Sequence, residues 1–328
     1  MAGGAARRQY GVLSPGRAGD FLLTTGLFNA IKAHDPDVEL TVVVGPRAGG
    51  MARAHPAIDR VLVFDRHPLR ILPFFFRLRD RVFDAWLDPK DHFSRNQTLI
   101  AQAVRARVKV GFNRPGGGPF QLLVRPPTDP MRHFSEMMMA PLDLLGVPWT
   151  RPPRLSIGVP EAAEARAAGV VGARAPFEVF VNISAGLPIR YWTEAKWIEL
   201  LPRLAAERST RFWLSAAPED REAAARIEQA VAAKGVQVRR TPAGSILDVA
   251  ALVRRMDAVL TVDTSIVHLA AIFDRPIVAL YRDKRPECDQ FRPLSTRQRV
   301  LFSSPGGLVA EIEVQDVARA WRELLSGL

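Results

Sequence analysis

Residues 10–33 read YGVLSPGRAGDFLLTTGLFNAIKA, and they set the pattern from which the fold can be predicted. Residues 10–13 are a short apolar stretch typical of a strand, residues 14–20 hold the glycines and proline of a loop, and residues 21–33 have helical apolar spacing. A strand, a glycine loop and a helix in this order are typical of a parallel α/β domain. The loop glycines lack the three-glycine spacing of a dinucleotide fingerprint, which disfavours a nicotinamide cofactor.

The same alternation continues along the chain and restarts once. Residues 148–160 are rich in proline and indicate a linker between two Rossmann-like domains, which we expect over residues 1–155 and 156–328. The fold class is therefore α/β, with mostly parallel, doubly wound sheets. The predicted strands are residues 10–13, 40–44, 60–64, 83–87, 108–111, 177–183, 210–215, 237–239, 258–262 and 276–281, and the predicted helices are residues 21–33, 50–54, 94–106, 193–207, 219–234, 246–255, 266–273 and 314–325.

The composition is that of a globular protein, because 48% of the 328 residues are hydrophobic and two domains of this length can each bury a core. No apolar run approaches the roughly 20 residues that span a bilayer, and residues 1–8 lack the apolar region of a signal peptide. We expect a cytoplasmic protein that can associate with a membrane surface. Cys288 is the single cysteine, which excludes an intrachain disulfide and a multi-cysteine metal site.

The net charge of +11 favours polyanionic partners such as phospholipid headgroups, phosphorylated glycolipids or nucleic acid. The excess leans toward the first half, where residues 1–150 hold 20 basic against 13 acidic side chains, while residues 151–328 hold 25 against 21. A second explanation stays open. Arginine accounts for 39 of the 45 basic residues, and the base composition of the coding DNA can produce such a bias without selection for binding.

Ligands of doubly wound sheets bind at the carboxyl ends of the strands, so polar residues in strand-to-helix loops are the candidate site residues. Asp20 ends the first of these loops. Its carboxylate could act as a general base that takes the proton of a sugar hydroxyl at the interdomain cleft. The alternative is an ordinary helix cap, because aspartate is favoured at the start of a helix.

The first loop of the second half is suited to a diphosphate. Ser184, Gly186 and Arg190 precede a predicted helix, where backbone amides and a guanidinium can hold phosphate oxygens. A fixed cation would also stabilise the charge that builds on a leaving diphosphate. The alternative is that Arg190 is one of many solvated arginines.

Two further loops add candidate donor-binding groups. Asp263 or Thr264 would cap the predicted helix at residues 266–273, with His268 one turn inside it. A buried, hydrogen-bonded structural histidine is the alternative for His268. Glu219 could accept hydrogen bonds from ribose hydroxyls, or it could cap a surface helix.

Taken in order, these segments resemble glycosyltransferase family 9, the lipopolysaccharide heptosyltransferases, over most of the chain. Gly19-Asp20 with FLLTT at residues 21–25 is similar to the family's N-terminal motif, and RYWT at residues 190–193 is similar to its Lys-x-Trp-Pro segment. The most specific match is DTSIVHLAA at residues 263–271, which resembles the Asp-Thr-Gly-x-x-His-x-Ala signature. The departures are Gly26 for proline, Arg190 for lysine, Thr193 for proline and Ser265 for glycine.

The resemblance implies a GT-B fold, in which an acceptor domain and a donor domain face each other across a cleft and a C-terminal helix crosses back. It implies an inverting transfer of heptose from ADP-heptose, a co-substrate, to a lipopolysaccharide inner-core acceptor, without a metal or another cofactor. Asp20 would be the catalytic base. The implied donor-binding residues are Ser184, Arg190, Glu219, Asp263, Thr264, Ser265 and His268.

Residues 66–81 form a basic and aromatic segment that we expect to bind a phosphorylated glycolipid at the inner face of the cytoplasmic membrane. Five arginines stand there against one acid, Asp80, and three consecutive phenylalanines, residues 74–76, cannot all face one core from a regular helix. The alternative is a core of phenylalanines with a solvated face of arginines. The candidate acceptor-binding residues are Gly19, Arg66, Arg70, Arg77 and Arg79.

Other functions stay open at this point. The chain could use another sugar nucleotide or a protein acceptor, or it could be a sugar-nucleotide epimerase, which shares the two-domain architecture. It could also be a non-catalytic polyanion-binding protein on the same fold, which would need the basic patches but not Asp20. Among partners, we expect a nucleotide sugar and a phosphorylated glycolipid rather than nucleic acid.

Overall fold

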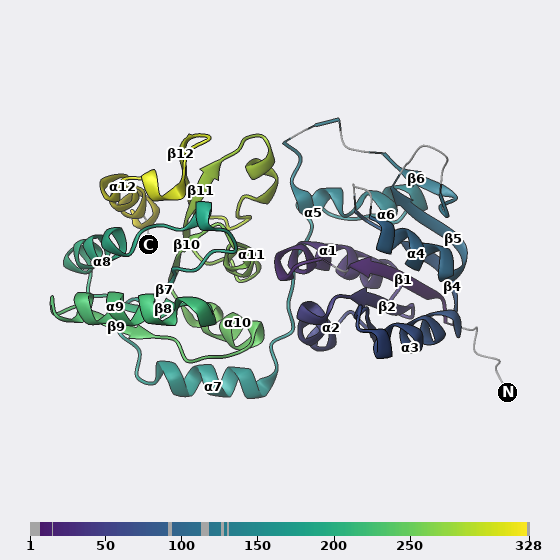
Figure 1. Ribbon diagram of the computed structural model, residues 1–328, viewed down its shortest axis with the longest axis horizontal. Coiled ribbons are helices and arrows are strands. Elements are labelled where there is room, and N and C mark those ends of the chain that lie inside the picture. Colours follow the sequence, from purple (N-terminus) through teal and green to yellow (C-terminus); the bar gives the residue numbers. More distant parts are fainter. Residues whose placement is uncertain are drawn as a thin grey trace. The chain divides into compact units, whose positions relative to one another are not determined.

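The computed structural model divides into two compact units, with the boundary after Gly158, where the sequence placed it after residue 155. Each unit is an α/β domain with one sheet and helices on both of its faces (Figure 1), so the predicted fold class is confirmed. Residues 1–6, where no signal peptide was expected, and Pro15 lie outside the described residues. The structure describes residues 7–14, 16–90, 94–112, 118–125, 128–129 and 131–326.

The first unit has the strand order β3-β2-β1-β4-β5-β6, and all neighbouring strands are parallel. Its strands are rich in Val and Leu, as parallel strands buried on both faces require. The elements are β1 (Gln9–Ser14), α1 (Ala18–His34), β2 (Glu39–Val44), η1 (Pro46–Ala48), α2 (Gly49–Ala54), β3 (Arg60–Val63), α3 (Pro68–Arg79), β4 (Val82–Leu87), α4 (Arg95–Ala103), β5 (Arg105–Phe112), β6 (Leu122–Val124), α5 (Phe134–Met137) and α6 (Ala140–Leu145).

The second unit has the strand order β12-β11-β10-β7-β8-β9, which is the same doubly wound topology, again wholly parallel. The elements are α7 (Glu161–Val171), β7 (Glu178–Asn182), η2 (Pro188–Arg190), α8 (Glu194–Glu207), β8 (Arg211–Ser215), η3 (Pro218–Asp220), α9 (Arg221–Ala232), β9 (Gln237–Arg240), α10 (Ile246–Arg255), β10 (Ala258–Val262), α11 (Ser265–Ile272), β11 (Ile277–Asp283), η4 (Glu287–Phe291), β12 (Gln298–Pro305), η5 (Val309–Glu311) and α12 (Val314–Leu325).

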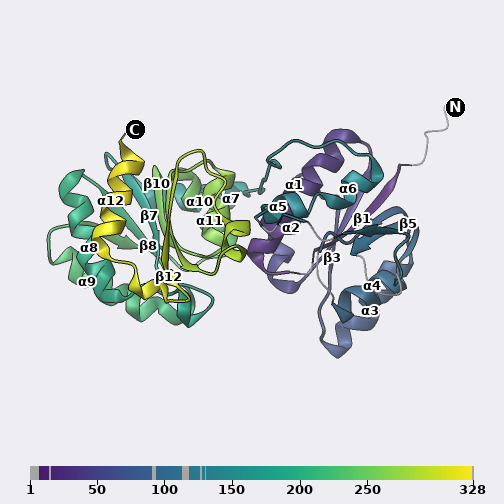
Figure 2. The same cartoon turned by 90° about the horizontal axis from the view of Figure 1, so that it is seen from above.

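Helices cover both faces of the second sheet. Figure 2 shows α8, α9 and α12 on one face, with α10 and α11 on the other. The last helix, α12, contacts α8 and strands β11 and β12, and its Val317, Trp321 and Leu324 are buried in the core of this unit. In the described part of the chain, no helix has both the length and the apolar character needed to cross a membrane.

Several predicted boundaries were wrong. The helix expected over residues 94–106 ends at Ala103, because Arg105 already begins β5. The apolar residues Val104 and Ala106 fit a helix and a strand equally well, so their pattern could not separate the two. Strands β6 and β12 and helices α3, α5, α6 and α7 were not predicted; β6 has three residues and β12 is an edge strand flanked by polar residues.

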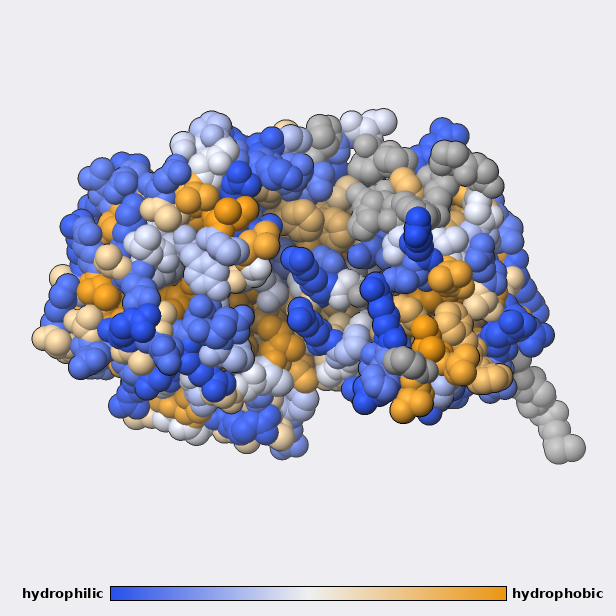
Figure 3. All heavy atoms as spheres, viewed as in Figure 1, coloured by the Kyte–Doolittle hydropathy of each residue, from blue (hydrophilic) through white to orange (hydrophobic). Residues whose placement is uncertain are grey.

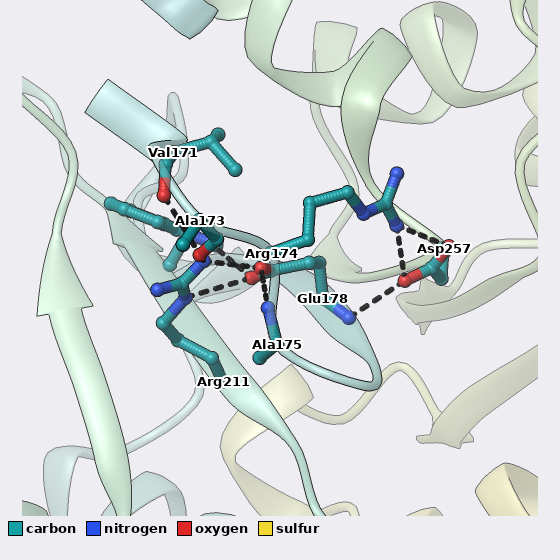
Figure 4. A network of polar contacts seen from close by, with 8 residues as sticks. Val171, Ala173, Arg174, Ala175, Glu178, Arg211 and Asp257 are labelled. Atoms are coloured by element: carbon teal, nitrogen blue, oxygen red, sulfur yellow. Dashed lines mark hydrogen bonds and ion pairs between the residues drawn. The ribbon is translucent and has the colours of Figure 1, made fainter. Parts of the chain in front are cut away.

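A buried ion pair holds the amino edge of the second sheet. Glu178, the first residue of β7, is fully buried and pairs with Arg211, the first residue of β8, and it also accepts hydrogen bonds from Trp213 Nε1 (2.8 Å) and the Ala175 amide (2.7 Å). Burial alone would raise the pKa of Glu178, but these donors outweigh it and lower that pKa below its ordinary value. Figure 4 shows the network, which continues to Asp257.

The chain that leaves the first unit is fixed to α1 and α2. A Cβ atom on Gly26 of α1 would lie 2.7 Å from Pro153 Cβ, so only glycine allows this close approach. Asn29 Nδ2 donates to Ser156 Oγ at 2.8 Å, and His55 Nε2 lies 2.9 Å from the same oxygen. The linker residue Ser156 is therefore part of the folded first unit, and the close packing of Pro153 against α1 accounts for a glycine at position 26.

Candidate active site

The strand order of the second sheet reverses between β7 and β10, which are neighbours. The chain therefore leaves β7 toward α8 on one face and leaves β10 toward α11 on the other (Figure 2). In doubly wound sheets such a reversal at the carboxyl edge is where ligands bind. The sequence singled out residues 184–193 and 263–265 separately, and both loops start at this edge.

Asn182, the last residue of β7, connects the two loops. Its Nδ2 lies 3.0 Å from the Ser184 carbonyl oxygen, 3.0 Å from Thr261 Oγ1 and 3.2 Å from Thr264 Oγ1. Asn182 was not among the site residues predicted from the sequence. The available signal was a polar side chain at the end of an otherwise apolar strand, but its partners depend on β7 and β10 being neighbours.

Helix α11 begins at the same edge. Thr264 is its N-cap, and the Thr264 hydroxyl oxygen accepts a hydrogen bond from the Ile266 amide at 3.3 Å. Ser265 is the first helical residue, and His268 lies one turn inside, where it is buried. The helix start presents backbone amides and a positive dipole end, which together favour an anion.

Arg190 and Asp263 form an ion pair across the two loops. Arg190 Nη1 lies 2.9 Å from Asp263 Oδ2; the arginine side chain is 36% exposed and the aspartate side chain 19%. Burial raises the pKa of Asp263, although the positive charge of Arg190 opposes this effect. The guanidinium is thus held by a carboxylate on one side and remains accessible to a ligand on another.

The loop after β8 joins the same edge. Ser184 Oγ accepts a hydrogen bond from the Ala217 amide at 2.7 Å, which ties the loop after β7 to the one that carries Glu219. Glu219 is exposed in η3, and the Tyr191 hydroxyl donates to Asp220 Oδ2 at 2.9 Å. The structure therefore places the predicted donor-binding residues in three adjacent strand-end loops, except for Ser265 and His268, which lie in α11 directly after one of these loops.

In the first unit, Asp20 lies in the first turn of α1, next to Gly19. Its Oδ2 accepts a hydrogen bond from the Arg17 amide at 3.0 Å, and the same oxygen lies 3.9 Å from Lys90 Nζ. A Cβ atom on Gly16 would lie 2.3 Å from that oxygen. Asp20 therefore does serve in a capping box, and it also faces a cation that follows β4, the neighbour of β1.

A cavity of about 750 Å³ lies at the carboxyl edge of the first sheet. Three cations line it, from the ends of three strands: Arg47 after β2, Arg66 after β3 and Lys90 after β4. One carboxylate, Asp65, also lines it. Arg47 and Lys90 were not among the predicted site residues, although both follow predicted strands. The balance of charge suits an anionic ligand.

The other candidate acceptor residues are spread along α3. Arg70 pairs with Asp65 at 2.7 Å and so stays next to the cavity. Arg77 and Arg79 lie in the last turn of α3, which runs back toward the amino edge of the sheet, where β4 begins. A helix of this length spans about 18 Å, so the structure does not bring Arg77 and Arg79 together with Arg66.

Among the residues that the structure describes, no group of three or more His, Cys, Asp or Glu side chains is placed to hold a metal ion. The groups that converge are one carboxylate with basic neighbours in the first unit, and hydroxyls, a helix start and an arginine in the second. Such groups suit proton transfer from a hydroxyl and the binding of a diphosphate, respectively.

A protein-family model matches most of the chain. Residues 71–321 match the model of glycosyltransferase family 9 (heptosyltransferase). Among curated proteins, no sequence matches the chain significantly.

Solved structures give matches over nearly the whole chain. A glycosyl transferase family 9 protein from Veillonella parvula DSM 2008 has a TM-score of 0.82 at 18% identity, covering 98% of each chain. E. coli ADP-heptose lps heptosyltransferase II has a TM-score of 0.76 at 19% identity, covering 97% of this chain and 98% of its own. E. coli heptosyltransferase WaaC, solved with ADP and with ADP-2-deoxy-2-fluoro heptose, has a TM-score of 0.74 at 21% identity, covering 96% of this chain and 97% of its own in the ADP complex. These likenesses confirm the predicted GT-B fold.

Proposed function

This chain belongs to glycosyltransferase family 9, the heptosyltransferase family, and on that basis we propose that it transfers heptose from ADP-heptose to a lipopolysaccharide inner-core acceptor. The observation that carries the proposal is the convergence of Arg190, Asp263 and the start of α11 at the topological reversal of the second sheet. That convergence supplies a cation and backbone amides, the two groups that a nucleotide diphosphate needs.

The donor that fits this edge is a nucleotide diphosphate sugar. In this proposal the start of α11 and Arg190 bind the two phosphates, with contributions from Ser184 and Ser265 and from His268 one turn inside α11. Glu219 lies in η3, which follows β8, and its exposed carboxylate can accept hydrogen bonds from the ribose hydroxyls. The adenine and heptose parts of the donor are supported by the complexes of E. coli WaaC, which hold ADP and an ADP-heptose analogue.

The reaction is a single displacement with inversion. Asp20 takes the proton of an acceptor hydroxyl, whose oxygen forms a bond to the anomeric carbon as the bond from that carbon to the diphosphate oxygen breaks. ADP leaves with the bonding electron pair, and Arg190 stabilises the negative charge that develops on it. The Arg17 amide and Gly16 fix the position of the Asp20 carboxylate in the first unit.

The acceptor is a phosphorylated glycolipid, which the first unit binds at the inner face of the cytoplasmic membrane. Arg47, Arg66 and Lys90 in the cavity of that unit supply the charge that phosphate or carboxylate groups of the inner core require. Lys90 lies close to Asp20, so a hydroxyl of a ligand bound beside Lys90 would be near the proposed base.

ADP release tests the proposal against its alternatives. The purified chain is incubated with ADP-heptose, and in parallel with UDP-, GDP- and CMP-sugars, with and without heptose-deficient lipopolysaccharide. We expect ADP to appear only when ADP-heptose and the glycolipid are both present. An epimerase would change the sugar without any acceptor, and a polyanion-binding protein would bind the glycolipid without releasing a nucleotide.

A further inference from the structure

Helix α3 has two apolar faces, of which one is buried and one is exposed. Phe74 and Leu78 are 4% and 0% exposed and belong to the core that α3 and α4 form on one face of the first sheet. Leu69, Leu72 and Phe76 are 81%, 65% and 74% exposed. Spacings of three and four residues place these last three side chains on one side of the helix, opposite the core. We call these three residues the α3 stripe.

Arginines flank the α3 stripe on both sides. At about 100° per residue, Arg70 and Arg77 fall along one border of the stripe and Arg79 falls along the other. Within the described part of the chain, Arg77 and Arg79 have no ion-pair partner, whereas Arg70 is paired with Asp65. Figure 3 shows apolar surface gathered over the part of the first unit where Figure 1 places α3.

We propose that the α3 stripe inserts into the interfacial region of an anionic lipid bilayer, with the flanking arginines on the lipid headgroups. A helix that lies in a membrane interface has an apolar face bordered by basic side chains, and basic residues near an anionic surface add to its affinity. Here the buried side of the helix is fixed to the protein core, so the opposite side is free to enter the interface without unfolding. The positive charge of the arginines that flank the α3 stripe favours an anionic surface.

A second copy of the chain is a poorer occupant of the same surface. Two-fold pairing through the α3 stripe would bring the flanking arginines of the two molecules together whether the two helices run parallel or antiparallel, and no acidic residue of α3 itself could offset them. The area of three side chains on one helix is also small for a stable protein interface. Lipid headgroups supply the negative charge that this surface lacks.

This inference deepens the proposed function, because it assigns the membrane contact to one element. Arg66 lines the cavity and precedes α3 by two residues, so the start of the stripe lies next to the proposed acceptor site in the same unit. A glycolipid whose acyl chains stay in the bilayer could therefore present its sugars at the cavity. The stripe shortens the distance over which the acceptor must leave the membrane.

Vesicle co-sedimentation tests the inference without any acceptor or donor. The parent chain should sediment with vesicles of phosphatidylglycerol and phosphatidylcholine at low salt, and bind far less to phosphatidylcholine alone or at high salt. Changing the α3 stripe to serine (Leu69→Ser, Leu72→Ser, Phe76→Ser) should weaken binding at least about ten-fold, because three apolar side chains leave the interface. The matched control changes three exposed apolar residues elsewhere: Met131→Ser, Leu144→Ser and Leu308→Ser.

Two charge-reversal variants complete the test. Arg77→Glu with Arg79→Glu should release the chain from anionic vesicles, whereas Arg239→Glu with Arg297→Glu makes the same change of net charge in the second unit and should bind like the parent. The inference would be overturned if the stripe variant bound vesicles as well as the parent does. It would also be overturned if either control variant lost as much binding as the variant that it matches. If light scattering shows a dimer for the parent and a monomer for the stripe variant, and the parent does not bind lipid, the stripe makes a protein contact instead.

Activity separates this inference from the proposed function. With an acceptor whose acyl chains have been removed, the stripe variant should transfer at the parent rate, while with the acceptor embedded in vesicles its rate should fall together with lipid binding. Vesicle binding by a parent chain that transfers no heptose would contradict the proposed function and leave the inference standing. Equal rates of parent and stripe variant on embedded acceptor would contradict a role of the stripe in acceptor access.

Discussion

Arg190 Nη1 lies 2.9 Å from Asp263 Oδ2, an ion pair that joins the loop after β7 to the loop after β10. The two residues are far apart in sequence and meet because β7 and β10 are neighbours at the topological reversal. Asp263 restricts the guanidinium before any ligand arrives, so little side-chain freedom remains to be lost on binding. We regard this pair as the anchor of the proposed diphosphate site.

Loss of the arginine should weaken nucleotide binding. Arg190→Ala removes a charge-assisted contact worth about 1.5–3 kcal/mol, so the Kd for ADP in calorimetry should rise roughly 10- to 150-fold. Arg190→Lys keeps the positive charge but lacks the planar fork of the guanidinium, so its Kd for ADP should lie between those of the parent and of Arg190→Ala. His268→Ala should weaken ADP binding in the same direction.

Arg226→Ala is the matched control for this series, since Arg226 lies in an exposed pair with Glu194 on neighbouring helices of the same unit. It should bind ADP as the parent does. Unchanged ADP affinity in both Arg190→Ala and His268→Ala would rule out the proposed diphosphate site.

Gly16→Ala should impair turnover by displacing Asp20. The new Cβ would lie 2.3 Å from Asp20 Oδ2 and 2.7 Å from Asp20 Cβ, so the carboxylate must move away from its position. We expect kcat to fall by about ten-fold or more, as misplacement of a general base predicts, with ADP affinity unchanged. Gly50→Ala is the control, because its Cβ would meet nothing within 4 Å. Equal kcat values for the two variants would contradict the assigned geometry.

His55 should make the first unit sensitive to acid. Burial lowers the pKa of His55 to about 4, against about 6.5 in an unfolded chain. Between these values the unfolded state binds more protons than the folded state, so the free energy of unfolding should fall as the pH drops from about 6.5 to about 4, by about 3 kcal/mol in total. Urea unfolding of the parent and of His55→Gln across this range measures the effect. If the free energy of unfolding of the parent changed as little with pH as that of His55→Gln, the His55 imidazole would not be held neutral in the folded state.

Removal of the buried carboxylate should destabilise the second unit. Glu178→Ala leaves Arg211 buried without its partner, which typically costs about 3–5 kcal/mol in the free energy of unfolding. Glu323→Ala, in an exposed pair with Arg299, should cost no more than about 1 kcal/mol. Chemical denaturation of both variants gives the comparison, and similar losses would mean that the network in Figure 4 contributes no more than a surface pair.

The sequence predicted the parallel strands well where they are buried on both faces, because β2 and β10 are almost uninterrupted runs of apolar residues. It failed where local pattern is weak, as in the three-residue β6 and the edge strand β12. The end of α4 was misplaced because Val104 and Ala106 suit either structure. Only the pairing of β5 with β4 decides that Arg105 begins a strand.

The sequence was enough to predict which loops form the site, but not which residues of those loops contact each other. The strand-end rule found Arg190 and Asp263, yet their ion pair follows from the strand order, which no local pattern contains. Lys90 follows a predicted strand, but its approach to Asp20 could not be predicted for the same reason, since β4 lies beside β1 only in the folded sheet. Arg77 was grouped with Arg66 because both lie in one short segment, although α3 carries Arg77 to the opposite edge of the sheet.

The role of Asp20 as base is the central claim, and one comparison tests it most directly. The parent and Asp20→Asn are each incubated with ADP-heptose and heptose-deficient lipopolysaccharide, the glycolipid is analysed by mass spectrometry, and ADP affinity is measured on the same samples. We expect the parent to add one heptose, and Asp20→Asn to lose about 10²- to 10⁴-fold in rate while it binds ADP normally. A folded Asp20→Asn variant that transfers heptose at nearly the parent rate would contradict the account.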